Sequence, residues 1–201
     1  MTTLKPKPWD ATALWIAIGF GAVAVVWTAV HAVQRIAQIV PNRDVPFTAS
    51  FADTPVTLPF GVGGAEVPAT VERVVLQVSD LPAITLVALI IAEIIYALAV
   101  IITVACVCLV IRNLIIGKAF DRSTIRLVGI ATLTVAFGWV LTWLFTTMGA
   151  NGGTAALSGR TIDNTNAGFD PLLLFGIASL GALTVAFQAG GRLQRDTEGL
   201  V

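Results

Sequence analysis

The sequence predicts an all-α membrane protein, a bundle of four transmembrane helices with a small β-leaning extracytoplasmic loop between helices 1 and 2. Of the 201 residues, 56% are hydrophobic and 12% are charged, whereas soluble domains carry about 25% charged residues. Residues 84–111 form an apolar run with one charge, Glu93. An apolar run beyond about 18 residues is long enough to span a bilayer as a helix, and three other stretches share this character.

Residues 11–40 predict the first transmembrane helix. A cleaved signal peptide is the alternative, because Val30-His31-Ala32 resembles a cleavage site. The apolar part of this segment is about 20 residues long, whereas the apolar region of a signal peptide has about 7–15 residues. The length therefore favours an uncleaved helix.

Residues 41–82 differ in composition, with prolines and glycines between short β-leaning pieces at 47–51, 56–60 and 71–78. The last piece alternates in the manner of a half-buried strand. We expect a small β-ribbon outside the membrane, too small to be a separate domain.

The rest of the chain alternates apolar spans with short polar segments. Gly117 is expected to end the second helix and Ser123 to cap the third. A stretch rich in glycine, asparagine and threonine predicts a loop after the third helix, and Pro171 suits the start of the fourth. The predicted segments are a span at residues 83–113, a cytoplasmic link at 114–123, a span at 124–148, an extracytoplasmic loop at 149–168, a span at 169–190 and a cytoplasmic tail at 191–201.

The placement of lysine and arginine predicts the orientation, because cytoplasmic segments carry an excess of both residues. The side with both termini holds Lys5, Lys7, Arg112, Lys118, Arg122, Arg126, Arg192 and Arg195, whereas the opposite side holds Arg35, Arg43, Arg73 and Arg160. We therefore expect a multi-pass protein of the plasma membrane with both termini in the cytoplasm and the lipid bilayer as a partner.

Glu93 is the charged residue of the central span, and an ionisable group there is a candidate functional site. It lies 19 residues before Arg112, which is ~28 Å of helix against a hydrocarbon core ~30 Å thick. His31 lies 20 residues after Ala11, at a similar depth of ~30 Å. The counting predicts both residues at one level, near the outer interface.

Two partners for Glu93 follow from this placement. His31 is one, and Arg35, one helical turn further on the same face, is the other. Tyr96 shares a face with Glu93 and is positioned to hydrogen-bond it. The set has three interpretations: a structural polar contact, a proton- or ligand-sensing pair, or a transport site.

Small residues recur every four positions in the last span, at Ala178, Ala182, Ala186 and Gly190. Small residues at this spacing let another helix approach closely. We expect packing within the bundle, with a homo-oligomeric face as the alternative.

The sequence lacks the patterns of an enzyme. It contains one histidine and two cysteines, Cys106 and Cys108, both inside the central span, so we expect no metal site and no cofactor. No nucleophile–base motif or phosphate-binding loop is present, and no dense basic run predicts nucleic-acid binding. We therefore expect no catalytic residues.

Two segments carry a family resemblance. Residues 117–131, GKAFDRSTIRLVGIA, resemble the G-x-P-F-(S/T)…N…L-R-x-I-G segment of the DUF2975 family of small bacterial four-helix integral membrane proteins, with Ala119 and Thr124 departing from the pattern. The C-terminus, GRLQRDTEGLV, resembles that family's G-x-x-L-x-x-D-x-E-G-L-V ending. The layout of four helices with an outer β-leaning loop is similar as well.

The resemblance implies a bacterial cell membrane protein without established catalytic activity, often encoded beside a small Xre-type helix-turn-helix regulator. A non-enzymatic membrane sensor or anchor for such a regulator is thus the expected function, and a small transporter or channel subunit is the alternative. The candidate cytoplasmic partner surface consists of Arg122, Arg126, Arg192, Arg195, Asp196 and Glu198. Its arginines have a second interpretation, as anchors that contact lipid phosphates.

Overall fold

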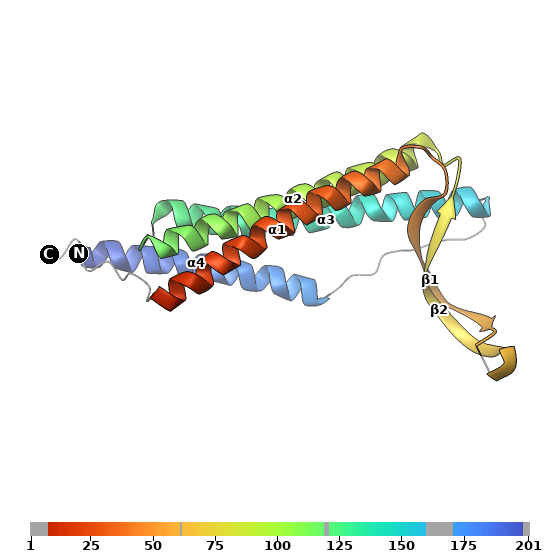
Figure 1. The fold of residues 1–201 in the computed structure, drawn as a ribbon, viewed down its shortest axis with the longest axis horizontal. Helices are drawn as coiled ribbons and strands as arrows, with labels where there is room; N and C mark the ends of the chain where they lie inside the picture. The colour runs from red at the N-terminus through yellow and green to blue at the C-terminus, as the bar shows by residue number, and fades with distance from the viewer. Residues whose placement is uncertain (1–7, 61, 119–120, 160–170, 199–201) are drawn as a thin grey trace. The chain divides into compact units, whose positions relative to one another are not determined.

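The computed structural model describes residues 8–60, 62–118, 121–159 and 171–198. Within these residues the elements follow the order shown in Figure 1: α1 (Pro8–Ile39), β1 (Val45–Leu58), the 3-10 turn η1 (Val62–Gly64), β2 (Val67–Val78), α2 (Ala83–Ile115), α3 (Arg122–Ser158) and α4 (Pro171–Glu198). They divide into two compact units. The helix unit draws on Met1–Val33, Ile94–Leu141 and Asp170–Val201, and the ribbon unit on Gln34–Glu93 and Thr142–Phe169.

Among the described residues, four helices are long and apolar enough to cross a membrane. They have 32, 33, 37 and 28 residues, so at 1.5 Å per residue each is ~42–56 Å long and exceeds a hydrocarbon core of ~30 Å. The chain is therefore a multi-pass membrane protein. The prediction of four apolar helices with a small β part is confirmed, and the orientation stays a prediction.

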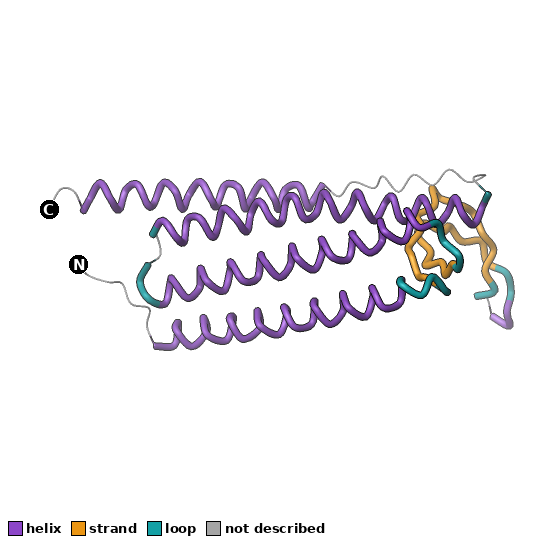
Figure 2. The backbone as a smooth tube through the Cα atoms, turned by 90° about the horizontal axis from the view of Figure 1, so that it is seen from above, coloured by secondary structure: helices purple, strands orange, loops and turns teal. Residues whose placement is uncertain are grey.

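Glycines let the helices approach closely in the helix unit, where Figure 2 shows them running side by side. A Cβ atom added to Gly21 of α1 would lie 2.6 Å from Cys108 Sγ of α2, and one added to Gly138 of α3 would collide with Ala99 of α2. A hydrogen bond of 3.0 Å joins the Thr132 and Thr184 hydroxyls of α3 and α4. Large apolar side chains on the outer faces are exposed, as a lipid-facing surface requires.

An antiparallel hairpin of β1 and β2 forms the centre of the ribbon unit. The register runs from Val45 opposite Val78 to Leu58 opposite Val67, with an irregularity between Ser50 and Thr54. The inner half of the hairpin packs into a core made by Ile39, Val45, Phe47, Ala49, Val78, Leu81, Leu89 and Ala150. This burial supports the hairpin, since a two-stranded ribbon alone is marginally stable. The predicted β-ribbon is thus present, and its first two predicted pieces belong to one strand.

The predicted end of the third helix at residue 148 is wrong, because α3 continues to Ser158. The sequence prediction treated the glycines as loop residues, but here they are packing residues. A Cβ atom on Gly149 or Gly152 would collide with Leu89 or Thr85 of α2, and one on Gly153 would lie 2.5 Å from the Phe47 ring.

The ends of the other helices also differ in detail from the prediction. Gly117, with φ of 78°, ends α2 as expected. The next residue, Lys118, donates its N–H back to the Asn113 carbonyl in the last turn of the helix, which is the hydrogen bond of a Schellman motif. Asp121, not Ser123, caps α3: its carboxylate accepts hydrogen bonds from the backbone N–H groups of Arg122 and Ser123, and a further one of 2.8 Å from Ser123 Oγ. The predicted polar tail is helical to Glu198, because its leucine, glutamine, arginine and glutamate are good helix formers.

Candidate functional site

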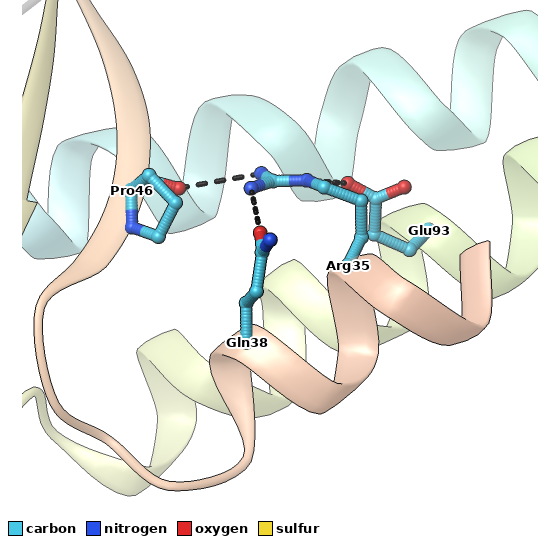
Figure 3. A network of polar contacts seen from close by, with 4 residues as sticks. All are labelled: Arg35, Gln38, Pro46 and Glu93. Carbon is cyan, nitrogen blue, oxygen red and sulfur yellow. Dashed lines mark hydrogen bonds and ion pairs between the residues drawn. The ribbon is translucent and has the colours of Figure 1, made fainter. Parts of the chain in front are cut away.

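Arg35 lies at the centre of a polar network in the ribbon unit (Figure 3). The residue sits in the last turns of α1, Glu93 comes from α2, and Pro46 comes from the start of β1. Figure 3 shows the guanidinium between these groups, with Gln38 of α1 beside it. One side chain therefore joins three elements that are far apart in sequence.

Each of three Arg35 nitrogens donates to a different acceptor. Nε lies 3.2 Å from Glu93 Oε1 and forms an ion pair with it. Nη1 donates to Gln38 Oε1 at 3.3 Å, and Nη2 donates to the Pro46 carbonyl at 3.3 Å. A guanidinium suits this role because its planar fork presents several donors in fixed directions and remains charged at any physiological pH.

The ion pair is partly withdrawn from water. The Arg35 side chain is 26% exposed and that of Glu93 is 21% exposed. An unpaired charge at this level of burial would be unfavourable, so each group makes the other tolerable. The Pro46 carbonyl lies next to strand residues Val45 and Phe47, both buried in the core of the ribbon unit. The network thus fixes the start of β1 against α1 and α2.

Asn42, in the link between α1 and β1, forms hydrogen bonds with the link between β2 and α2. Its amide Nδ2 donates to the Leu81 carbonyl at 3.1 Å, and its Oδ1 accepts from the Leu81 N–H at 2.9 Å. The Asp80 N–H donates to the Asn42 carbonyl. Sequence reasoning missed this residue. The available signal was an asparagine next to Pro41, because asparagine tolerates the left-handed backbone of tight turns, and its φ here is 53°.

The structure places the remaining members of the predicted polar set elsewhere. Arg35, rather than His31, forms the ion pair with Glu93. The His31 side chain is exposed, and Tyr96 is 51% exposed. The predicted alternative partner is therefore the one that the structure shows.

Three arginines of the predicted cytoplasmic surface come together in the helix unit. Arg122 and Arg126 of α3 and Arg192 of α4 line one pocket. The side chains of Arg195, Asp196 and Glu198 lie outside the described part. Arg122, Arg126 and Arg192 were predicted in one cytoplasmic surface from the family resemblance and the expected position of the link and tail, whereas their shared pocket is seen only in the fold.

The predicted small-residue face of α4 is not buried against the described part of the chain. Ala178, Ala182 and Ala186 are exposed, and Gly190 is half-buried. The face of α4 that meets α3 is rotated from this stripe and carries Leu180 and Thr184, since Thr132 Oγ1 approaches both the Leu180 carbonyl and the Thr184 hydroxyl.

The described residues contain no group of three or more histidine, cysteine or acidic side chains that could hold a metal ion. Comparison with protein-family models, with curated proteins and with solved structures finds no match. The resemblance to the DUF2975 family therefore stays a prediction based on the two quoted segments. The Arg35 network is a charge-pairing site by its chemistry, because a guanidinium is paired with a carboxylate and donates to a strand carbonyl.

Proposed function

We propose that this protein is a non-enzymatic membrane sensor or anchor, in which the β-ribbon is coupled to the transmembrane helices and a cytoplasmic helix-turn-helix regulator is the partner. The observation that carries the proposal is the Arg35 network. Two of its three hydrogen bonds connect α1 to α2 and to β1, so a displacement of the ribbon changes contacts made by two helices.

Continuity of the helices supports the coupling. α1, α2 and α3 each contribute residues to both the ribbon unit and the helix unit. In the proposed mechanism, a change at the Arg35 network is passed to the helix unit along these continuous helices. Sensing requires two states with different ligand contacts, and the proposal takes the bonded Arg35 network as one of them.

The regulator as partner follows from the resemblance of residues 117–131 and of the C-terminus to the DUF2975 family. The cytoplasmic surface proposed for it comprises the link and the end of α4, where Arg122, Arg126 and Arg192 are close together. Opposite charge on the regulator would complement this surface.

Co-purification tests the proposal. The tagged full chain is isolated from cells that express a small Xre-type regulator from the neighbouring reading frame, and the amount of regulator retained is measured. Deletion of residues 194–201 is expected to reduce retention, and it leaves Arg192 in place. Arg35→Gln is expected to change retention as well, whereas Arg43→Gln, which removes an exposed charge nearby, is the matched control.

Amide hydrogen exchange on the same variants measures how far the Arg35 network stabilises β1 and α2. Arg35→Gln is expected to accelerate exchange in β1 and in the part of α2 around Glu93, because three hydrogen bonds are lost. Retention of the regulator that is the same for the wild type, the tail deletion and Arg35→Gln would refute the proposed function.

A further inference from the structure

A small pocket in the helix unit is lined by the first turns of α3 and the last turns of α4. Its lining residues are Arg122, Ile125, Arg126, Gln188 and Arg192, and its volume is about 270 Å³. Binding sites for drug-sized ligands measure about 300–1,000 Å³. This pocket is therefore suited to a ligand group rather than to a large molecule.

The pocket has a positive charge from its described lining residues. Three guanidinium groups line it, and no carboxylate stands among the described lining residues. Asp121, next to Arg122 in sequence, has its carboxylate engaged by Ser123 Oγ at 2.8 Å. The three arginines are exposed, so water screens their mutual repulsion, and an anion bound between them would turn the remaining repulsion into attraction. Arginine forks match the oxygens of a phosphate group in geometry as well as in charge.

The pocket lies at the ends of two membrane-length segments. Arg122 is the first residue of the apolar stretch of α3, and Arg192 is the second-last residue of the apolar stretch Leu174–Leu193 of α4. With the predicted spans at residues 124–148 and 169–190, Arg122 and Arg192 lie just outside the hydrocarbon core, at the level of the bilayer phosphates. On the two helices, Ile130 is 47% exposed and Val185 is 64% exposed, so apolar surface is available to acyl chains one to two turns from the arginines.

We propose that this pocket is a phosphate-binding site, occupied by the headgroup phosphate of an anionic phospholipid. Arg122, Arg126 and Arg192 pair with the phosphate oxygens, and the Gln188 amide donates to a headgroup oxygen. Ile125 contacts the apolar part of the ligand. The site goes beyond the sensor or anchor function, because lipid binding requires neither a ribbon signal nor a regulator. The phosphate occupies the pocket between the three arginines, which leaves the outer part of the proposed cytoplasmic surface, with Arg195, Asp196 and Glu198, to the regulator.

Native mass spectrometry of the full chain in detergent tests the site, with phosphatidylglycerol as the anionic probe and phosphatidylcholine as the neutral one. The wild type is expected to retain phosphatidylglycerol selectively. Arg192→Gln should weaken retention about fivefold, the effect of one cation near an anionic surface. The triple variant Arg122→Gln/Arg126→Gln/Arg192→Gln should weaken it roughly 100-fold.

Two further variants separate a built site from general charge attraction. Arg112→Gln removes an exposed charge from the predicted cytoplasmic end without touching the pocket, and it should leave retention unchanged. Arg192→Lys keeps the charge but loses the planar fork, so a loss of affinity with it supports specific geometry. Should the triple variant fail to fold, as judged by its helical circular dichroism, the single Arg192 variants decide the matter.

Competition with inorganic phosphate identifies the source of the phosphate. Displacement of phosphatidylglycerol only by other anionic lipids supports a lipid site. Complete displacement by inorganic phosphate supports the phosphate chemistry and assigns the pocket to a soluble ligand. Equal losses in Arg112→Gln and Arg192→Gln, or undiminished selectivity in the triple variant, would overturn the proposal.

Discussion

Replacing Gly153 with alanine tests whether glycines in α3 exist for close packing against the ribbon. The added Cβ would lie 2.5, 2.7 and 2.9 Å from three ring carbons of Phe47, whereas carbon atoms pack best at about 3.5–4.0 Å. The ring must therefore retreat by about 1 Å. Phe47 is 4% exposed and belongs to the core of the ribbon unit, so its neighbours must move too.

Overpacking of this kind destabilises by about 1–3 kcal/mol. The same substitution also stabilises a helix by up to about 1 kcal/mol, because alanine is the better helix former. The expected net loss for Gly153→Ala is therefore about 1 kcal/mol. The control is Gly176→Ala in α4, where a new Cβ would meet nothing within 4 Å and only the stabilising effect remains.

Amide hydrogen exchange of β1 measures this loss, because local opening exposes the strand hydrogen bonds. Gly153→Ala is expected to accelerate exchange at residues 45–50 about fivefold, and Gly176→Ala is expected to leave it unchanged. Phe47→Leu should destabilise β1 less in the Gly153→Ala background than in the wild type, because the smaller leucine leaves room for the added Cβ atom. If β1 exchanges at the same rate in Gly153→Ala and Gly176→Ala, the ring is not confined and the packing argument fails.

Three further predictions concern polar groups. A double-mutant cycle with Arg35→Met and Glu93→Gln should give a coupling of about 1–2 kcal/mol in detergent unfolding, between the values of exposed and buried pairs; a coupling near zero would contradict the network. The pKa of Asp121 is lowered, chiefly by the Ser123 hydrogen bond. The contribution of this carboxylate to stability is therefore present above the usual aspartate pKa and is lost as the pH falls through the lower pKa of the folded state. Asp121→Ala should remove this dependence on acidic pH from the unfolding midpoint. Thr132→Val, which removes the 3.0 Å contact with Thr184, should cost less than about 1 kcal/mol, and a loss well above that in the same unfolding assay would refute the estimate.

The sequence predicts the spans well because a single quantity, the length of an apolar run, determines them. The end of α3 could not be predicted in the same way. Glycine has two opposite uses, in turns and in close helix contacts, and only the fold shows that Gly149, Gly152 and Gly153 face Leu89, Thr85 and Phe47. The cap of α3 was ambiguous for a related reason, because Asp121 and Ser123 are both good capping residues.

Local periodicity also left the packing face of α4 undetermined. Four small residues at a spacing of four define a stripe, but a helix has several such stripes, and the neighbour selects one of them. Here α3 meets the face with Thr184, and Ala178 and Ala182 remain exposed. A pattern on one helix thus predicts that close packing is possible, whereas the position of the partner helix decides whether it occurs in the chain.

The choice of Arg35 as the partner of Glu93 follows from what each candidate can satisfy. Counting residues along the helices gives depth alone, and it placed Glu93 level with His31. An imidazole offers at most two N–H donors, and its charge depends on pH. The guanidinium of Arg35 reaches Glu93, Gln38 and the Pro46 carbonyl at once. Because the Pro46 carbonyl belongs to the strand, the ion pair does more than neutralise a carboxylate: loss of the Glu93 charge would loosen the guanidinium and, with it, the start of β1.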